Sequence, residues 1–427
     1  MKITVYIISH NYGKYVNQAI QSVIRQTFKN WELILINNNS TDNTSNIFKK
    51  YKKNKKITIF SFKNKNFTQA CNFAAKTANG KYVIRLDGDD YFDPNILTVL
   101  SGYLENDKKL AMVYPDFFFI NKNNHIISYE WLEKKKNNRY KILPPNGACT
   151  LIRKSFLKKT GWYREDLGAQ DGLDLYFKFK KKYKIQNINL PLFYYRKHEE
   201  NLTNNELKIF NARRKIKSYN LKFTKKYSPV IAVIPCRKFF DFSKNLWSEE
   251  IGGKNLLERD IEMCRKSKII DKIVIVSDTN QVLKTVNKFK KKDERVLFFK
   301  RKMEDTSTKI SIFKSVKNII KKLDKKLSGI VVLRYIQTPF VTHNTLEEAI
   351  STLILSNSNT TIGIEKVQNE IFKRENEKLI SLNYKEKNQI NKANIYRDTT
   401  TCLAIKNKNF TKKNNLGKNI VGFEVTS

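Results

Sequence analysis

The chain has few cysteines and no long apolar run. Its cysteines are far apart, form no CxxC pair and are odd in number, so a disulfide framework or a zinc site is not expected and a reducing compartment fits. The five cysteines are Cys71, Cys149, Cys236, Cys264 and Cys402. No apolar run reaches the roughly 18 residues of a membrane-spanning helix. Because the sequence opens on a strand-like run at 3–8 rather than a cleavable signal, we expect a cytoplasmic protein.

Acidic residues are outnumbered by basic ones. The chain has 82 Lys and Arg against 40 Asp and Glu, a formal net charge of +42. Such an excess suggests nucleic acid, anionic lipid or a phosphorylated substrate as partner. The basic runs are scattered, however, and zinc-finger, RRM, KH and basic-heptad patterns are missing. We therefore expect no nucleic-acid partner and favour compositional bias; peripheral contact with the anionic inner face of a membrane is the alternative.

Strands and helices alternate along the first half of the 427 residues, a length that suits two or three domains. Short apolar runs predict strands, and apolar residues at helical spacing predict the helices between them. The predicted strands are 3–8, 33–36, 57–60 and 82–86, and the predicted helices are 16–26, 43–51 and 69–78. We expect Ser40 or Asp42 to cap the second helix. This alternation indicates a mostly parallel sheet with right-handed crossovers.

The same alternation restarts after a polar, basic segment with helical patterning. The predicted strands there are 229–235, 272–276 and 329–333, and the predicted helices are 256–264, 280–289 and 310–323. We therefore predict an α/β fold with two Rossmann-like domains, each a mostly parallel sheet flanked by helices. The predicted domains are 1–205 and 229–427, joined by a basic linker or helix at 206–228.

One apolar strand of the first half runs directly into a cluster of acids. The sequence Tyr-Val-Ile-Arg-Leu-Asp-Gly-Asp-Asp begins at Tyr82, so that Asp87, Asp89 and Asp90 follow the strand. Open α/β sheets bind ligands at this carboxyl edge. Two or three carboxylates there can hold a hard divalent cation, and the cation can hold a diphosphate. An ordinary solvated turn is the alternative, because Asp and Gly are common turn residues.

Other segments accompany the acid cluster in a characteristic order. They are Ser9-His10-Asn11-Tyr12, the stretch 19–27, the stretch 31–44 with three consecutive asparagines, Asn72 and Gly80. Together they resemble the GT-A family 2 glycosyltransferases over about residues 1–205. The resemblance implies a nucleotide-sugar donor, a divalent cation (Mn²⁺ or Mg²⁺) and an inverting displacement at the anomeric carbon.

The resemblance also implies roles for particular residues. Four would line the nucleotide pocket: Ser9, His10, Asn11 and Tyr12. Asn38 stands where the family usually has an Asp that reads the base, and its amide can hydrogen-bond a base edge without a charge. Asp87 would contact the ribose or the metal, and Asp89 would be the main metal ligand.

Two later segments resemble the rest of the family site. In the sequence Gly-Ala-Gln-Asp-Gly-Leu that begins at Gly168, Asp171 occupies the position of the base that deprotonates the acceptor hydroxyl. An Asp acts as a base through placement within ~3 Å of the hydroxyl and partial burial. A helix N-cap is the alternative role for Asp171. In the segment 194–203, Arg196 would meet the diphosphate and His198 the metal, although a lone histidine is often structural.

The second half carries a second set of motifs. They lie at 232–237, 244–246, 253–257, 273–278, 331–340 and 395–399. They resemble the cytidylyltransferases that activate acidic sugars of the sialic or KDO type, over about residues 229–427. Arg237 and Lys244 keep the charges expected beside the nucleotide. The glycine-rich phosphate loop is replaced by 238–243, with three phenylalanines and no glycine, and Gln337 and Thr338 stand where a metal-binding Asp is expected. We therefore expect a degenerate domain.

These features predict an inverting, metal-dependent glycosyltransferase of surface polysaccharide or glycoconjugate synthesis. It would move a sugar from a nucleotide-sugar donor to a glycan or lipid-linked acceptor. One alternative is a bifunctional chain whose second half forms a CMP-sugar. Another is a non-catalytic nucleotide-sugar-binding scaffold. It is favoured by the loop 238–243 and by Asn37, Asn38 and Asn39, which stand where the family usually has Asp, Asp and Gly. Metal-dependent donor hydrolysis separates the transferase from the scaffold.

Overall fold

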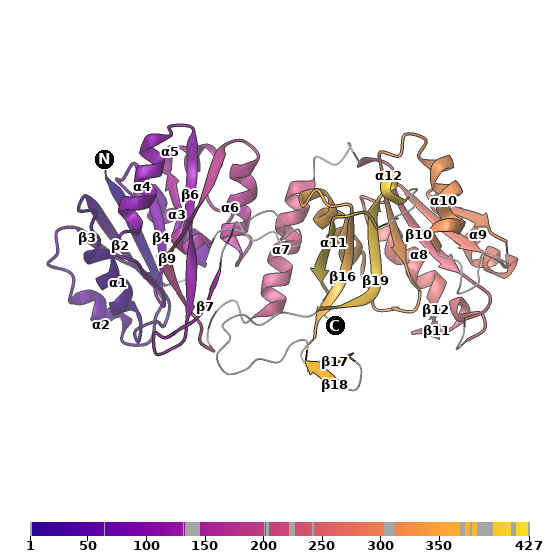
Figure 1. Cartoon of the computed structure of the whole chain (residues 1–427), viewed down its shortest axis with the longest axis horizontal. Coiled ribbons are helices and arrows are strands. Elements are labelled where there is room, and N and C mark those ends of the chain that lie inside the picture. The colour runs from indigo at the N-terminus through magenta and orange to yellow at the C-terminus, as the bar shows by residue number, and fades with distance from the viewer. Residues whose placement is uncertain are drawn as a thin grey trace. The chain divides into compact units, whose positions relative to one another are not determined.

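The described residues fall into two compact units. The computed structural model describes residues 2–63, 65–130, 132, 146–199, 201, 205–221, 227–240, 243–302, 312–367, 372–375, 378–381, 396–410 and 416–425. One unit reaches to Ile216 and the other runs from Lys217 onward. Helix α7 (Glu206–Leu221) contains this change of unit. The domain limits at 205 and 229 remain predictions, and each unit is described by itself below (Figure 1).

The first unit has a sheet with the strand order β3-β2-β1-β4-β8-β6-β9-β5, and β7 pairs with β6. Its first four strands are mutually parallel: β1 (Ile3–Ser9), β2 (Trp31–Asn38), β3 (Ile57–Phe62) and β4 (Tyr82–Asp87). The helices between them are α1 (Val16–Ile24), α2 (Thr44–Lys49) and α3 (Phe67–Thr77). Apolar periodicity therefore placed each of these elements within about two residues at either end.

The other half of this sheet is mixed. Its strands are β5 (Tyr91–Phe92), β6 (Leu110–Ile120), β7 (Ile126–Glu130), β8 (Leu151–Arg153) and β9 (Lys184–Arg196). The β6–β9 pair is parallel, whereas β8 pairs antiparallel with β4 and β6. The helices are α4 (Ile96–Asn106), α5 (Lys154–Lys159) and α6 (Asp171–Lys180), with a short 3₁₀ turn η1 (Gly147–Cys149). This half brings α6 and η1 to the edge where β4 ends.

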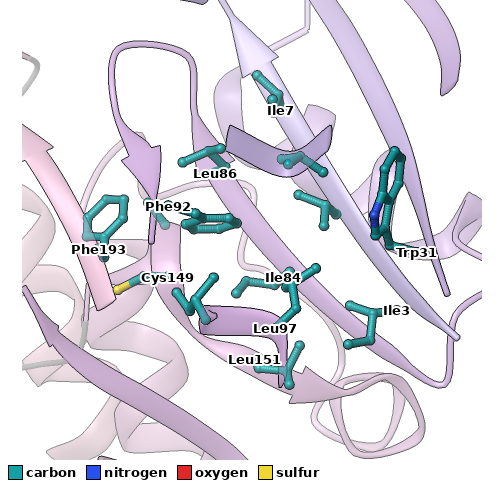
Figure 2. Packing of buried hydrophobic residues seen from close by; sticks show 14 of the residues in the cluster. Ile3, Ile7, Trp31, Ile84, Leu86, Phe92, Leu97, Cys149, Leu151 and Phe193 are labelled. Atoms are coloured by element: carbon teal, nitrogen blue, oxygen red, sulfur yellow. The ribbon is translucent and has the colours of Figure 1, made fainter. Parts of the chain in front are cut away.

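The alternation of side chains along β4 determines what faces the ligand edge. Figure 2 shows Ile84 and Leu86 in the hydrophobic core that includes Ile7 of β1. Successive side chains of a strand point to opposite faces. Arg85 and Asp87 therefore share the other face of β4.

The start of α2 differs from the prediction. Its N-cap is Asn43, whose side chain makes no capping hydrogen bond. Asp42 instead accepts hydrogen bonds from the backbone N–H of Thr44 at 3.0 Å and from that of Gly13 at 2.7 Å. Asp42 thus supports the first turn of α2 and also ties the β1–α1 loop to it. A side chain at Gly13 would clash here, because an added Cβ would lie 1.7 Å from the Asn43 amide oxygen.

The second unit repeats the α/β plan in the order β14-β13-β10-β15-β19-β16-β20. Its strands are β10 (Val230–Cys236), β13 (Lys272–Ser277), β14 (Val296–Lys300), β15 (Ile330–Arg334), β16 (Thr360–Lys366), β19 (Tyr396–Lys406) and β20 (Ile420–Glu424). Its helices are α8 (Leu256–Lys266), α9 (Leu283–Lys290), α10 (Ile312–Leu323), α11 (His343–Leu355) and α12 (Asn407–Phe410). Strands β14, β13, β10 and β15 are parallel, and β19 is antiparallel to β15 and β16.

Two short hairpins complete the second unit: β11 (Glu250–Ile251) with β12 (Lys254–Asn255), and β17 (Phe372–Glu375) with β18 (Lys378–Ser381). The predicted fold class, two mostly parallel sheets flanked by helices, is confirmed. Among the helices of the described residues, none is long and apolar enough to span a bilayer.

Candidate active site

A cavity of about 750 Å³ lies at the carboxyl edge of β1, β2 and β4. Seven of the predicted site residues line it together: His10, Asn11, Tyr12, Asn38, Asp87, Asp89 and Asp171. Open α/β sheets bind ligands at this position. Residues as far apart in the sequence as His10 and Asp171, 161 positions, therefore line one cavity.

The loop after β1, with Asn11, and the loop after β2, with Asn38, line one side of the cavity. The ring Nδ1 of His10 lies 2.8 Å from the backbone oxygen of Asn38. The side-chain oxygen of Asn11 accepts a hydrogen bond from the backbone N–H of Thr41 at 2.8 Å. Asn11 and Asn39 adopt φ values of 60° and 63°, in the left-handed region that asparagine tolerates better than most residues. The β1 and β2 loops thus hold each other in place.

The three consecutive asparagines have separate tasks. Asn37 bonds within its own loop, donating to the Ser45 hydroxyl at 2.6 Å and accepting from the Ser40 backbone at 3.0 Å. Asn39 takes the left-handed turn, and of the three only Asn38 lines the cavity. The Asn38 amide nitrogen donates to the Lys65 carbonyl at 3.1 Å, which leaves its side-chain oxygen buried without a hydrogen-bond partner among the described residues. Asn38 therefore offers an acceptor.

Ser9 and Arg196, two predicted donor-binding residues, do not line the cavity. Ser9 is fully buried. The guanidinium of Arg196, also buried, donates to the backbone oxygen of Asp89 at 2.7 Å and to Gln18 at 2.8 Å. Its backbone N–H donates to Asp90 at 2.8 Å. Arg196 therefore fixes the acid turn after β4 from behind, and donor contact by Ser9 and Arg196 stays a prediction.

The acid turn concentrates negative charge beside the cavity. Burial raises the pKa of Asp87 to about 6, with Arg85 opposing and the Asp89 and Asp171 carboxylates adding to the rise. Burial likewise raises the pKa of Asp90, with the charges of Asp89 and Asp87 contributing. A bound cation would relieve the repulsion among these carboxylates.

The donor set around Asp89 fits a hard cation shared with a ligand. The ring Nε2 of His198 lies 3.0 Å from Asp89 Oδ2, and the Asn201 amide donates to the same oxygen at 3.3 Å. Among the described residues, Asp89 Oδ1 has no hydrogen-bond partner. No group of three or more His, Cys, Asp or Glu side chains in this part of the chain is placed to hold a metal alone. Mg²⁺ is often held by one or two carboxylates together with substrate phosphates.

His198 does not itself line the cavity. Its ring packs 5.3 Å from the ring of Tyr15 and contacts Asp89. This arrangement orients the Asp89 carboxylate, whereas direct metal ligation by His198 stays a prediction.

Asp171 lies across the cavity, at the start of α6. The helix N-cap is Gln170, in the left-handed conformation with φ 60°, so the alternative cap role of Asp171 is not realised. Asp171 is the first residue of the helix, where a carboxylate is favoured by the helix dipole. Its carboxylate is paired at 2.5 Å with Arg85, which also lies 2.9 Å from Asp87.

Sequence reasoning missed several residues that line the cavity. They are Arg85, Phe117, Phe119, Gln170, Tyr195, Lys197, Asn201 and Lys208. One signal was available: Arg85 interrupts an apolar strand two residues before Asp87 and so lies on the same face. Lys208 belongs to α7, within the segment 206–228 that was predicted as a basic linker or helix with no site role.

In the second unit, the two predicted nucleotide-binding residues lie in the loop after β10. The guanidinium of Arg237 lies 4.4 Å from the centre of the Phe240 ring, and the Lys244 ammonium lies 5.9 Å from that of Phe239. Phe239 and Lys244 also form an isolated antiparallel bridge. The cations thus cover the aromatic rings of a folded-back loop. Nucleotide binding by Arg237 and Lys244 stays a prediction; Asp241 and Phe242 lie outside the described residues.

A buried ion pair stands at the carboxyl end of β15. Arg334 and Asp260 are paired at 2.9 Å, and both are almost fully buried. Burial raises the pKa of Asp260 to about 6, with Arg334 opposing.

Both sequence resemblances are confirmed by family matches. Residues 4–161 match Glycosyl transferase family 2, and residues 243–419 match the family described as Cytidylyltransferase. A chondroitin synthase of Escherichia coli is 25% identical over 251 residues, which cover 56% of this chain and 36% of that protein. A hyaluronan synthase of Pasteurella multocida is 27% identical over 191 residues, covering 44% of this chain and 19% of that protein.

Another relative is closer in length. An uncharacterized glycosyltransferase of Rickettsia typhi is 29% identical over 226 residues, covering 49% of this chain and 69% of that protein. By contrast, this chain spans only about a third or less of the length of the chondroitin and hyaluronan synthases. Staphylococcus aureus TarS 1–349, solved with UDP-GlcNAc, is 15% identical with a TM-score of 0.46, covering 93% of this chain and 99% of that one.

Proposed function

We propose that this protein transfers a sugar from a nucleotide-sugar donor to a glycan or lipid-linked acceptor. The family 2 glycosyl transferase match in the first half and the cytidylyltransferase match in the second half support the proposal. One observation carries the proposal. The acid turn after β4 and Asp171 of α6 line the same cavity, at the ligand edge of the sheet. The reaction belongs to surface polysaccharide or glycoconjugate synthesis on the cytoplasmic side, with peripheral membrane contact through the lysines.

The displacement needs a base beside the hydroxyl group of the acceptor molecule. A carboxylate oxygen of Asp171 takes the proton of the acceptor hydroxyl, whose oxygen forms a bond to the anomeric carbon. The bond from that carbon to the phosphate oxygen breaks, and the nucleoside diphosphate leaves with the electron pair. Attack opposite to the leaving group inverts the anomeric configuration.

The remaining residues bind and neutralise the donor. Asp89, with Asp87 beside it, would hold Mn²⁺ or Mg²⁺, and such an ion stabilises charge on a diphosphate leaving group. Arg85, Lys197 and Lys208 add positive charge to the cavity walls. The Asn38 side-chain oxygen would accept a hydrogen bond from the base.

The test is a panel of UDP-, GDP-, TDP- and CMP-sugars with glycan acceptors, with and without Mn²⁺. We expect one donor to turn over only with the cation, and Asp89→Ala to lose that turnover at least 100-fold. Asp171→Asn is expected to lose transfer while still binding donor. Asp107→Asn is the matched control, because that carboxylate pairs with Lys184 at the surface, 2.8 Å away, and does not line the cavity. Full transfer by Asp171→Asn would refute the assignment of the base.

A second candidate concerns the second unit. Its family match and the retained Arg237 and Lys244 favour nucleotide binding, whereas the phenylalanine-rich loop argues against phosphate chemistry. We therefore propose that this unit binds a nucleotide or a CMP-sugar and does not catalyse the formation of a CMP-sugar. Calorimetry should detect CTP or CMP binding, and pyrophosphate release from CTP and an acidic sugar should be missing. Measurable release would favour the bifunctional alternative.

A further inference from the structure

Arg85 contacts both sides of the proposed reaction. Its guanidinium lies 2.5 Å from Asp171 Oδ2 and 2.9 Å from Asp87 Oδ1. The 2.9 Å contact joins Nε to Oδ1 as an ion pair without hydrogen-bond geometry, and the hydrogen bond to Asp87 runs from Nη2 to Oδ2 at 3.4 Å. Asp87 lies two residues further along β4, whereas Asp171 comes from α6. The planar guanidinium of Arg85 therefore links Asp87, the carboxylate on the donor side, to Asp171, the proposed base on the acceptor side.

The surroundings leave this guanidinium little freedom. Arg85 is only 4% exposed. The Phe67 ring lies 4.7 Å from the guanidinium carbon on one side. Gly147 of η1 packs against the pair so closely that an added Cβ would lie 2.7 Å from Asp171 Oδ2 and 2.9 Å from Arg85 Nη2. Such packing restricts the guanidinium and, through it, both carboxylates.

The guanidinium of Arg85 stands between two carboxylates at ion-pair distance, Asp171 at 2.5 Å and Asp87 at 2.9 Å. An arginine presents its donors in a rigid fork that can serve two carboxylates, whereas a lysine is a flexible point charge. The fork therefore sets geometry as well as charge.

We propose that Arg85 is the positioning residue of the transfer reaction, holding the base Asp171 and the donor-side acid Asp87 in a fixed relation across one guanidinium. This inference rests on the proposed function. The role goes beyond folding, because proton transfer and displacement need the acceptor hydroxyl and the donor sugar aligned. Misplacement of a reacting group by about 1 Å can cost about 100-fold in rate.

Arg153 offers a matched control in the same unit. It is also buried, at 5% exposure. Its guanidinium bonds the Leu110 carbonyl at 2.7 Å and the Tyr82 hydroxyl at 2.8 Å, and it does not line the cavity. Removal of Arg153 therefore reports what loss of a buried structural arginine does to the fold and to turnover.

The test compares kcat, donor KM and Tm for the wild type, Arg85→Met, Arg85→Lys and Arg153→Met. We expect Arg85→Met to lower kcat about 100-fold or more, with donor KM changed less than about tenfold. Arg85→Lys should be intermediate, since it keeps the charge and loses the fork. Arg153→Met should lower Tm at least as much and keep kcat per folded enzyme within about threefold. Adding guanidinium ion at millimolar concentration should raise the kcat of Arg85→Ala at least tenfold over its value without guanidinium.

Each outcome decides the matter. An unchanged kcat in Arg85→Met, or a change in KM alone, would overturn the inference. Donor turnover by the wild-type enzyme would still support the proposed function. Equal losses of kcat in Arg153→Met and Arg85→Met would reduce Arg85 to a structural role. If Arg85→Met fails to fold, Gly147→Ala disturbs the same pair without removing it. Absence of donor turnover in the wild type would refute the proposed function itself.

Discussion

Substitution of a single glycine tests the geometry of the proposed base. Gly147→Ala places a Cβ 2.7 Å from Asp171 Oδ2, whereas ordinary contacts begin near 3.4 Å. The carboxylate or the 3₁₀ turn must therefore shift by roughly 0.7 Å. A displacement of this order at a reacting group costs up to about 100-fold in rate, or about 2.7 kcal/mol of transition-state stabilisation.

The assay is steady-state transfer with saturating acceptor and varied donor. We expect kcat to fall, because Asn38 and Asp89, the residues proposed to bind the base and the metal, are untouched by the change. Gly102→Ala is the control: an added Cβ there meets nothing within 4 Å, and the residue lies inside α4. It should raise stability by about 0.5–1 kcal/mol and leave kcat unchanged. Wild-type kcat in Gly147→Ala would refute the reasoning.

Three further predictions follow from single contacts. Gly13→Ala should weaken binding of the nucleoside diphosphate about tenfold by calorimetry, since the Cβ would lie 1.7 Å from the Asn43 amide oxygen and part the two loops; unchanged affinity would contradict this. His198→Ala should weaken Mn²⁺ binding in the presence of the diphosphate 10- to 100-fold, because the histidine orients Asp89; electron paramagnetic resonance titration measures it. The raised pKa of Asp260, about 6 against an ordinary 3.8, adds stability below pH 4 that is lost as the pH rises through 6. The free energy of unfolding of the wild type, relative to that of Asp260→Asn, should therefore fall by roughly 3 kcal/mol between pH 4 and 7, and a flat difference would contradict a pKa raised by burial.

The order of strands and helices was predictable because it depends on local patterning. Apolar runs such as 82–86 and the helical spacing of 16–24 carry their own signal. The cap of α2 was mispredicted, because Asp42 is shared between its own helix and the N–H of Gly13 from another loop. A contact of that kind depends on tertiary structure.

The candidate site was predictable only in part. The acid cluster of Asp87 and Asp89 was indicated by its place directly after an apolar strand. Asp171 came from a family resemblance, since no local pattern says that α6 reaches the end of β4. Arg85 was overlooked although its spacing from Asp87 put both on one face. Donor contact by Arg196 stays a prediction, and its guanidinium is buried against Asp89 and Gln18. Burial and long-range pairing decide these roles, and neither can be read from one segment.

The most direct test of the central claim is donor turnover by the full chain with Mn²⁺, compared between the wild type and Asp89→Ala. The account predicts that one nucleotide-sugar is consumed with an inverted product, only with the cation, and that Asp89→Ala loses this activity at least 100-fold. Binding of donors without turnover in every case, with acceptors supplied, would contradict the account and favour a scaffold that binds nucleotide-sugars.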